Sequence, residues 1–129
     1  MDIRKISLYV LAIFYIAAGV NHFVNPEFYL PLIPDYFVYI EPINYLSGVA
    51  ETVLGVGLLF DASRKIASYL IVMLLLAFIP SHVYFIQIGS CVEGGLCIPE
   101  WGSWLRLLIV HPFFIWWAWS TRNYNAEKK

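Results

Sequence analysis

The sequence predicts an all-α fold, an integral membrane four-helix bundle with the N and C termini in the cytoplasm. Three observations predict it. Hydrophobic residues make up 60% of the 129 positions and charged residues only 13%, whereas a soluble domain carries about 25% charged residues. Four apolar segments approach the length of about 20 residues that crosses a bilayer. The basic residues gather at the chain ends and in one turn. We expect one domain over residues 1–129.

The four apolar segments are the predicted membrane spans. A helix rises 1.5 Å per residue, so the first, second and fourth segments are slightly short and their ends are expected in the interface. The first segment is too long for the core of a typical secretory signal peptide, and no small-residue cleavage pattern follows it. We therefore expect it to remain as a helix. The spans are Ile6–Phe23, Ile43–Phe60, Ile66–Gln87 and about Trp104–Trp119.

The connections between the spans differ in length. Asp61–Lys65 is so short that the second and third spans must be antiparallel neighbours. Val24–Pro42 is longer, and its four prolines exclude one continuous helix. We expect one or two short helices there, lying at the outer interface and covering the bundle; a re-entrant loop is the alternative. Ile88–Ser103 forms the second outer connection.

The distribution of lysine and arginine predicts the orientation. Cytoplasmic segments of membrane proteins carry an excess of these residues. Seven of the eight basic residues fall in the terminal segments and the tight turn, and the eighth, Arg106, lies just inside the fourth span. The two outer connections carry none, so both termini are expected in the cytoplasm. The seven residues are Arg4, Lys5, Arg64, Lys65, Arg122, Lys128 and Lys129.

Five ionisable residues fall within the predicted spans. Each costs roughly 2.5–3.5 kcal/mol to insert, so such residues mark functional sites by default. Counted from the outer ends of the spans, all five lie in the outer half, within about 12 Å of one another along the membrane normal. This clustering predicts a polar site in the outer half of the bundle. The residues are His22, Glu51, His82, Arg106 and His111.

Glu51 belongs to a stripe of small and polar residues on the second span. Ser47, Gly48, Glu51, Thr52 and Gly55 recur at spacings of three and four, which places them on one helical face. Small residues allow a neighbouring helix to approach closely. One interpretation is a packing face in which Glu51 bonds to a neighbour. The other is that Glu51 projects into a polar cavity; both remain open.

Prolines adjoin two of the histidines. Pro80 lies two residues before His82, and Pro112 follows His111. Each proline leaves a backbone carbonyl without its helical donor, which membrane proteins tolerate where the carbonyl lines a cavity. Arg106 precedes His111 by five residues, about 140° around an α-helix. We therefore expect that the two do not face the same site, and that Arg106 extends toward the headgroups.

Three stretches resemble the DoxX-like family of small membrane proteins. They are "AGVNHFVNPEFYLPLIP", "YLSGVAETVLGVGLL" and "FIPSHVYF", and the resemblance covers roughly residues 8–87. It implies a four-helix membrane bundle with a polar site built from His22, Glu51 and the region around His82. Relatives in that family include subunits of thiosulfate–quinone oxidoreductase, a maturation protein for methylamine dehydrogenase and assembly chaperones of animal receptors. It implies no single activity.

The first span ends at the predicted pocket. His22 lies where the first span emerges and the proline-rich segment folds over the outer mouth, so we expect Asn21 and His22 to face a capped, partly hydrated pocket. Tyr15, Ala18 and His22 share one helical face, which places Tyr15 deeper in that pocket. For His22 alone, a bond to headgroups or loops is the alternative. No catalytic residue and no metal ligand is predicted. The predicted ligand-binding residues are His22, Glu51, His82, His111, Asn21, Tyr15 and Arg106.

Cys91 and Cys97 are the two cysteines, and both lie in the second outer connection. Disulfides persist outside the cytoplasm, so we expect these residues to be joined. A structural clip on the loop is one interpretation. A redox-active pair that exchanges disulfides with a quinone pool is the other, although it lacks the C-x-x-C spacing of thiol oxidoreductases.

Three functions compete. The first is a small-molecule site, for a quinone or quinol, in a redox-linked role. The second is a non-enzymatic scaffold or assembly factor that recognises a partner protein. The third is a metal or haem site on His22, His82 and His111, although the spacing of known zinc motifs is absent. Whether the chain is an enzyme stays open.

The predicted location is the inner (plasma) membrane of a bacterium, with several passes through the bilayer. The lipid bilayer is the first predicted partner, and another membrane or redox protein is the second. A net charge of −1 and the absence of a basic patch in the sequence predict no nucleic-acid partner.

Overall fold

A computed structural model describes residues 2–125, and this part of the chain is helical without a β-strand. Lys128 and Lys129, two of the basic residues used to predict orientation, lie outside the described residues. The elements in chain order are α1 (Ile3–Val24), α2 (Pro26–Tyr29), the 3₁₀-helix η1 (Leu30–Leu32), α3 (Ile40–Leu58), α4 (Asp61–Ala77), α5 (Ile79–Gln87), α6 (Glu100–Leu105), the π-helix η2 (Arg106–Val110) and α7 (His111–Thr121).

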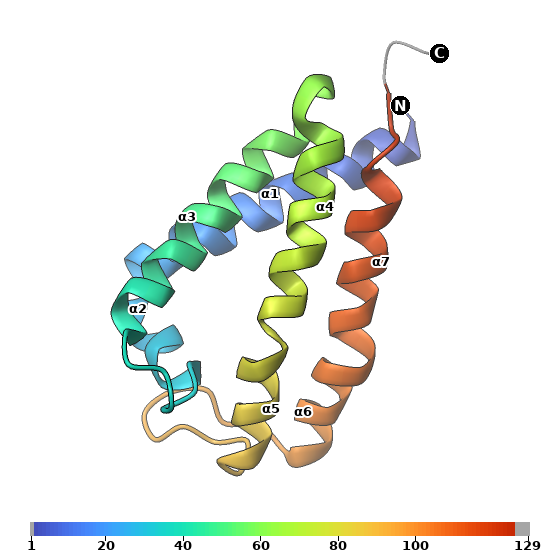
Figure 1. Cartoon of the computed structure of the whole chain (residues 1–129). Coiled ribbons are helices and arrows are strands. Elements are labelled where there is room, and N and C mark those ends of the chain that lie inside the picture. Colours follow the sequence, from blue (N-terminus) through green and yellow to red (C-terminus); the bar gives the residue numbers. More distant parts are fainter. Residues whose placement is uncertain (1, 126–129) are drawn as a thin grey trace.

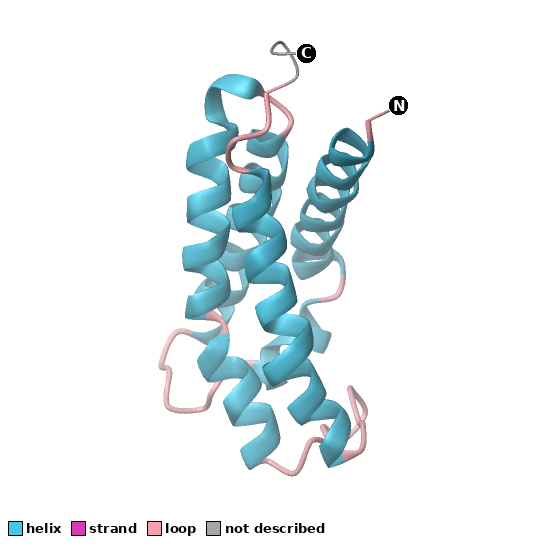
Figure 2. Ribbon diagram, turned by 90° about the vertical axis from the view of Figure 1, so that its right-hand side faces the viewer, coloured by secondary structure: helices cyan, strands magenta, loops and turns pink. Residues whose placement is uncertain are grey.

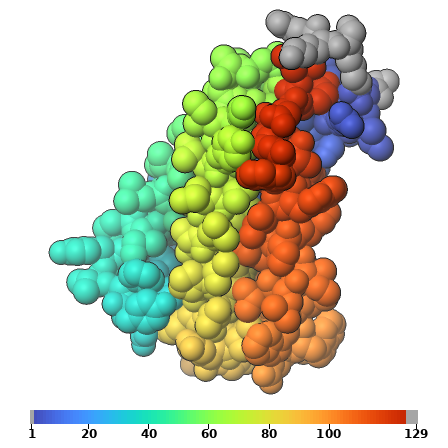
Figure 3. Space-filling model, turned by 45° about the vertical axis from the view of Figure 1, so that its right-hand side comes forward, coloured from blue at the N-terminus to red at the C-terminus, as the bar shows by residue number. Residues whose placement is uncertain are grey.

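Four long helical rods form the molecule (Figure 1). α1 and α3 are two of them, α4 continues into α5, and α6, η2 and α7 form the fourth. Figures 1 and 2 show the N-terminus, the link from α3 to α4 and the end of α7 at one end. α2, η1 and the loop before α6 lie at the other. α1 packs against α3, and α4 packs against both α3 and α7; Figure 3 shows α4 and α7 side by side.

The helices begin earlier than the apolar segments predicted. α1 begins at Ile3 because the Asp2 carboxylate accepts a hydrogen bond from the Arg4 backbone N–H at 3.1 Å and caps the helix. The predicted turn Asp61–Lys65 is in fact the first turn of α4, so α3 and α4 are even more closely linked than expected. The segment after α1 forms the short helices α2 and η1, as its prolines predicted.

Glycines hold α1 and α3 in backbone contact. A Cβ added to Gly19 would lie 2.2 Å from Thr52 Oγ1 and 2.6 Å from the Gly48 carbonyl oxygen. One added to Gly55 would lie 3.0 Å from the Ala12 carbonyl oxygen. Real Cβ atoms do not approach other atoms as closely as one at Gly19 would, so only glycine fits there, and the contact at Gly55 is tight. The small-residue stripe predicted on the second span is therefore a packing face for α1.

Arg64 joins three parts of the chain at the end that carries the termini. Its side chain is buried, with 4% of the residue exposed. Nε donates to the Leu58 carbonyl at 2.8 Å, Nη1 donates to the Tyr124 carbonyl at 2.8 Å, and the guanidinium also pairs with Asp61. A basic residue that the sequence placed in the tight turn after the second span is thus also a structural anchor.

Candidate functional site

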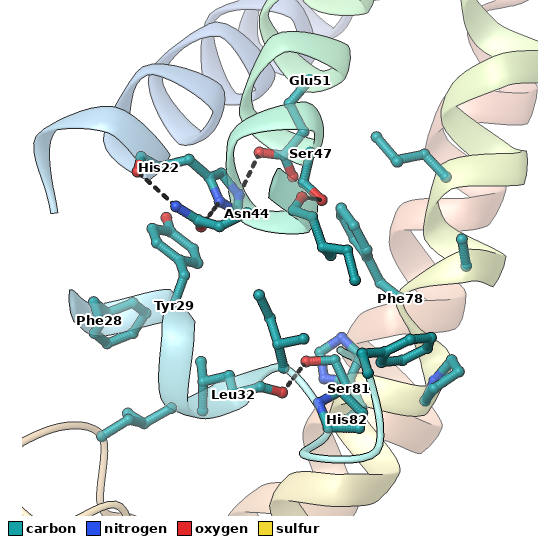
Figure 4. Close-up of a pocket in the computed structure, with 18 of the residues that line it drawn as sticks. His22, Phe28, Tyr29, Leu32, Asn44, Ser47, Glu51, Phe78, Ser81 and His82 are labelled. Carbon is teal, nitrogen blue, oxygen red and sulfur yellow. Dashed lines mark hydrogen bonds and ion pairs between the residues drawn. The ribbon is translucent and has the colours of Figure 1, made fainter. Parts of the chain in front are cut away.

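A cavity of about 470 Å³ lies between the α1–α3 pair and α4–α5. Residues of α2, η1 and the segment after η1 line its end that lies away from the chain termini. Most of its lining is apolar or aromatic, which suits an organic ligand. Figure 4 shows a polar cluster from α1 and α3 on one side of the space and residues of α5 on the other. The polar lining residues are His22, Tyr29, Asn44, Ser47, Glu51, Ser81, His82 and Arg106.

His22, Asn44 and Glu51 form the polar cluster. His22 Nδ1 lies 2.7 Å from Asn44 Oδ1, and Asn44 Nδ2 donates to the His22 carbonyl oxygen at 3.0 Å. His22 Nε2 lies 3.1 Å from Glu51 Oε2 (Figure 4). All three residues are buried. Their backbones are brought together by the glycine contact between α1 and α3, because Gly48 lies directly against the His22 Cβ.

The donors and acceptors around the His22 ring indicate that one proton lies between His22 and Glu51. Because the Asn44 amide nitrogen donates to a carbonyl, its oxygen faces His22 and accepts, so His22 Nδ1 carries a proton. Nε2 and the Glu51 oxygen cannot both lack a proton, since two lone pairs would then face each other. The pair is therefore either imidazole with carboxylic acid or imidazolium with carboxylate. Each form is neutral overall and holds one transferable proton.

Tyr29 covers the outer side of His22. The two rings stack with centroids 3.8 Å apart and planes 19° from parallel. Asn21 Nδ2 donates to the Tyr29 hydroxyl at 2.8 Å. The sequence predicted that Asn21 faces the pocket, and this is wrong: Asn21 lines no described cavity. Its amide instead reaches the neighbouring turn, where it holds Tyr29 over His22.

The outer wall of the cavity is tied to α5 and to the disulfide loop. Ser81 Oγ donates to the Leu32 carbonyl at 2.6 Å, which fixes η1 against α5. Cys91 and Cys97 form a disulfide, with the sulfur atoms 2.11 Å apart. Leu96, inside the loop that the disulfide closes, lines the cavity. The disulfide therefore holds an apolar side chain at the cavity mouth, which fits the structural interpretation of the pair.

Arg106 and His82 form a second polar pair across the cavity. Arg106 Nε and Nη2 lie 3.2 and 2.9 Å from His82 Nδ1. Arginine only donates, so His82 Nδ1 is the acceptor and the ring proton of neutral His82 sits on Nε2. The His111 ring lies edge-on to His82 with centroids 4.6 Å apart, and its Nε2 donates to the Leu75 carbonyl at 2.6 Å.

The prediction that Arg106 and His111 face different directions is wrong. Both line a second cavity, of about 270 Å³, together with His82. The reason is η2, a π-helical segment in which the His111 backbone N–H bonds to the Arg106 carbonyl oxygen. Bonding over five residues brings both side chains to one face, whereas an α-helix would separate them. Such π-helical insertions occur often at functional sites.

The other predicted site residues lie in the same region. Tyr15 is buried and lines the second cavity. Glu51 and His82 line both cavities, and His22 lines the first, so the three residues expected to converge do surround one space. Their role in binding a ligand stays a prediction. Within residues 2–125 no group of three or more histidine, cysteine, aspartate or glutamate side chains is arranged to hold a metal ion.

Sequence reasoning missed Asn44 and Tyr29. Asn44 lies seven residues before Glu51, two helical turns away and on the same face of α3. That spacing was sufficient to include Asn44 in the stripe. Tyr29 had no comparable signal, because its position over His22 depends on how α2 folds back after Asn25.

The fold and the site define a helical bundle whose buried histidine–glutamate pair lines an apolar cavity. Comparison with protein families makes the assignment more specific: residues 11–122 match the model of the family described as Domain of unknown function (DUF8561), and the chain belongs to it. No curated protein and no solved structure matches the chain.

Proposed function

We propose that the chain is a four-helix integral membrane protein that binds a quinone-type ring in its first cavity. The His22–Glu51 pair exchanges a proton with that ring. The DoxX-like resemblance supports the same architecture, and the inner membrane of a bacterium is the proposed location.

Length, composition and surface support the membrane part of the proposal. α1 and the continuous helix Asp61–Gln87 are long and apolar enough to cross a bilayer. α3 and the rod from α6 to α7 run alongside them. Large apolar side chains point outward, with exposed fractions of 67% for Leu46 and 62% for Trp116. A surface of this kind suits lipid better than water.

The basic residues support the orientation with both termini in the cytoplasm. Arg4, Lys5, Arg64, Lys65 and Arg122 all belong to segments at the end of the molecule that carries the termini (Figure 1). The cavity lies toward the opposite end. With basic residues inside, the site belongs to the outer half of the bundle, beside the disulfide loop.

The single observation that carries the ligand proposal is the position of the His22–Glu51 pair on the wall of an apolar cavity. A quinone has a flat apolar ring with carbonyl oxygens at its edge, so it needs an apolar space with a hydrogen-bond donor on one wall. The pair supplies that donor and one proton. Giving up that proton leaves neutral imidazole beside a carboxylate, an unfavourable arrangement that takes up a proton again from water. The second proton of the quinol also comes from water, and the two electrons come from a redox partner protein in the membrane.

Ligand titration tests the proposal. Protein purified in a non-ionic detergent and stripped of lipid is titrated with a short-chain quinone by calorimetry. Glu51→Gln keeps the shape of the side chain but removes its acid, and should weaken binding by about tenfold, which corresponds to a lost bond worth about 1.4 kcal/mol. Glu41→Gln, on the exposed first turn of the same helix, is the matched control. Equal affinities in all three proteins, or no binding by the unmodified protein, would overturn the proposal and favour a scaffold.

A further inference from the structure

The second cavity lies between α1 and the rod formed by η2 and α7. It has a volume of about 270 Å³ and adjoins the first cavity, because Tyr29, Glu51, His82 and Arg106 line both. The proposed binding of a ring in the first cavity makes no use of this space. Ring binding in the first cavity therefore does not explain why polar groups line the second.

The Tyr15 hydroxyl is the first of these groups. Only 2% of Tyr15 is exposed, and its hydroxyl oxygen is fully buried with no hydrogen-bond partner among residues 2–125. Buried hydroxyl groups are normally bonded, because losing water without gaining a partner costs free energy. Tyr15 lines the cavity, so a molecule in that space can supply the missing partner.

Arg106 is the second group. The ion pairs of the described residues join His22 to Glu51 and Arg64 to Asp61, and Arg106 takes part in neither. Its side chain bonds to the neutral ring of His82 and lies over the Phe85 ring at 5.0 Å. A guanidinium group has five N–H donors, and the bonds from Nε and Nη2 to His82 use two of them. The cation thus has spare donors and forms no ion pair with a carboxylate of the described residues.

The balance of donors and acceptors around the cavity is uneven. His82 has a ring N–H on Nε2, because its Nδ1 accepts from Arg106. The Nε2–H of His111 already donates to the Leu75 carbonyl. Glu51 is the carboxyl group among the lining residues; its buried Oε2 lies 3.1 Å from His22 Nε2 and has no other partner among residues 2–125. Beside the Glu51 carboxyl group, the cavity is thus lined by a cation, a buried phenol hydroxyl and an imidazole ring.

We propose that the second cavity binds an anionic oxygen group, a carboxylate or an oxyanion, held by Arg106 and the Tyr15 hydroxyl. Such a group is the natural complement of a guanidinium with free N–H donors. It has two sources: a free small oxyanion, or the headgroup of an amphiphile whose tail lies in the first cavity. The proposal does not rest on quinone binding, because its donors come from α1 and η2 and not from the His22–Glu51 pair.

Two probes distinguish the sources. Purified protein in a non-ionic detergent is titrated by calorimetry with sodium sulfate at constant ionic strength, and separately with a medium-chain fatty acid. Binding of sulfate identifies a free-anion site, and binding of the fatty acid alone identifies a headgroup site. Binding of neither overturns the proposal. The quinone titration is a separate measurement, so its outcome leaves this one standing.

Substitutions locate the site. Arg106→Gln should weaken binding of the effective probe at least about 30-fold, and Tyr15→Phe about fivefold, in line with the loss of a charged and of a neutral hydrogen bond. Arg106→Lys keeps the charge and should retain part of the affinity. It replaces Arg106→Gln as the test variant if Arg106→Gln does not fold. Arg122→Gln and Tyr69→Phe, outside both cavities, are the matched controls and should bind normally. Unchanged affinity in both Arg106 variants would overturn the assignment.

Tyr15→Phe has a second readout. In the absence of any added anion, the variant should unfold at the same temperature as the unmodified protein or higher, because it no longer buries an unsatisfied hydroxyl. A merely structural tyrosine would instead lose stability on the substitution. A lower unfolding temperature together with unchanged anion affinity would contradict the role given to Tyr15.

Discussion

Gly19→Ala should destabilise the protein, although alanine favours helices. The added Cβ would lie 2.2 Å from Thr52 Oγ1 and 2.6 Å from the Gly48 carbonyl oxygen. Relieving these contacts requires α1 and α3 to separate by about 1 Å, and such overpacking costs about 1–3 kcal/mol. Helix propensity alone would stabilise the variant by about 0.8–1 kcal/mol. Because backbone atoms provide most of the obstruction, we expect a net loss of about 1–2 kcal/mol.

The assay is reversible unfolding in detergent micelles, followed by circular dichroism. Gly102→Ala is the matched control: Gly102 is also helical, and a Cβ there would meet its nearest atom at an ordinary 3.5 Å. That variant should be unchanged or slightly more stable. The separation of α1 from α3 should also weaken quinone binding by Gly19→Ala, since His22 and Glu51 lie on the two helices. If Gly19→Ala proves as stable as Gly102→Ala, the close packing described for α1 and α3 is wrong.

Three further predictions concern the ends of the molecule. Arg64→Ala leaves the Leu58 and Tyr124 carbonyls without a donor, so the free energy of unfolding should fall by at least about 2 kcal/mol; a change below about 0.5 kcal/mol would mean that the anchor is unimportant. Replacing Cys91 and Cys97 by serine should lower stability by up to about 2–3 kcal/mol and weaken quinone binding, because Leu96 is released; a fully stable variant that loses only a redox activity would favour the redox-active interpretation. A reporter fused after the C-terminus should be located in the cytoplasm; a reporter found on the other side of the membrane would reverse the proposed orientation.

The arrangement of the long helices could be predicted from local sequence. Apolar length predicted where long helices form, and the spacing of Gly48, Thr52 and Gly55 predicted a packing face on α3, because helical periodicity fixes which side chains share a face. The convergence of His22, Glu51 and His82 could be predicted from their depth along the spans. Each of these features follows from the periodicity of a single helix or from the depth of a residue along its span.

Features that depend on contacts between segments could not be predicted. The π-helical turn places Arg106 beside His111, and nothing in the periodicity distinguishes it from an α-helix, on which the two residues diverge. Asn21 was assigned to the pocket because it precedes His22, but adjacent helical residues differ in direction by about 100°. Its side chain reaches Tyr29 instead. The stacking of Tyr29 on His22 arises only when α2 folds back over the end of α1.

Infrared difference spectroscopy tests the central claim most directly, that the His22–Glu51 pair exchanges a proton with a ring bound in the first cavity. The bound quinone is reduced electrochemically, and the spectrum of the reduced state is subtracted from that of the oxidised state. We predict a change in a protonated-carboxyl band that is absent in Glu51→Gln and preserved in Glu41→Gln. A spectrum without any carboxyl change, or one that Glu51→Gln leaves intact, would contradict the account.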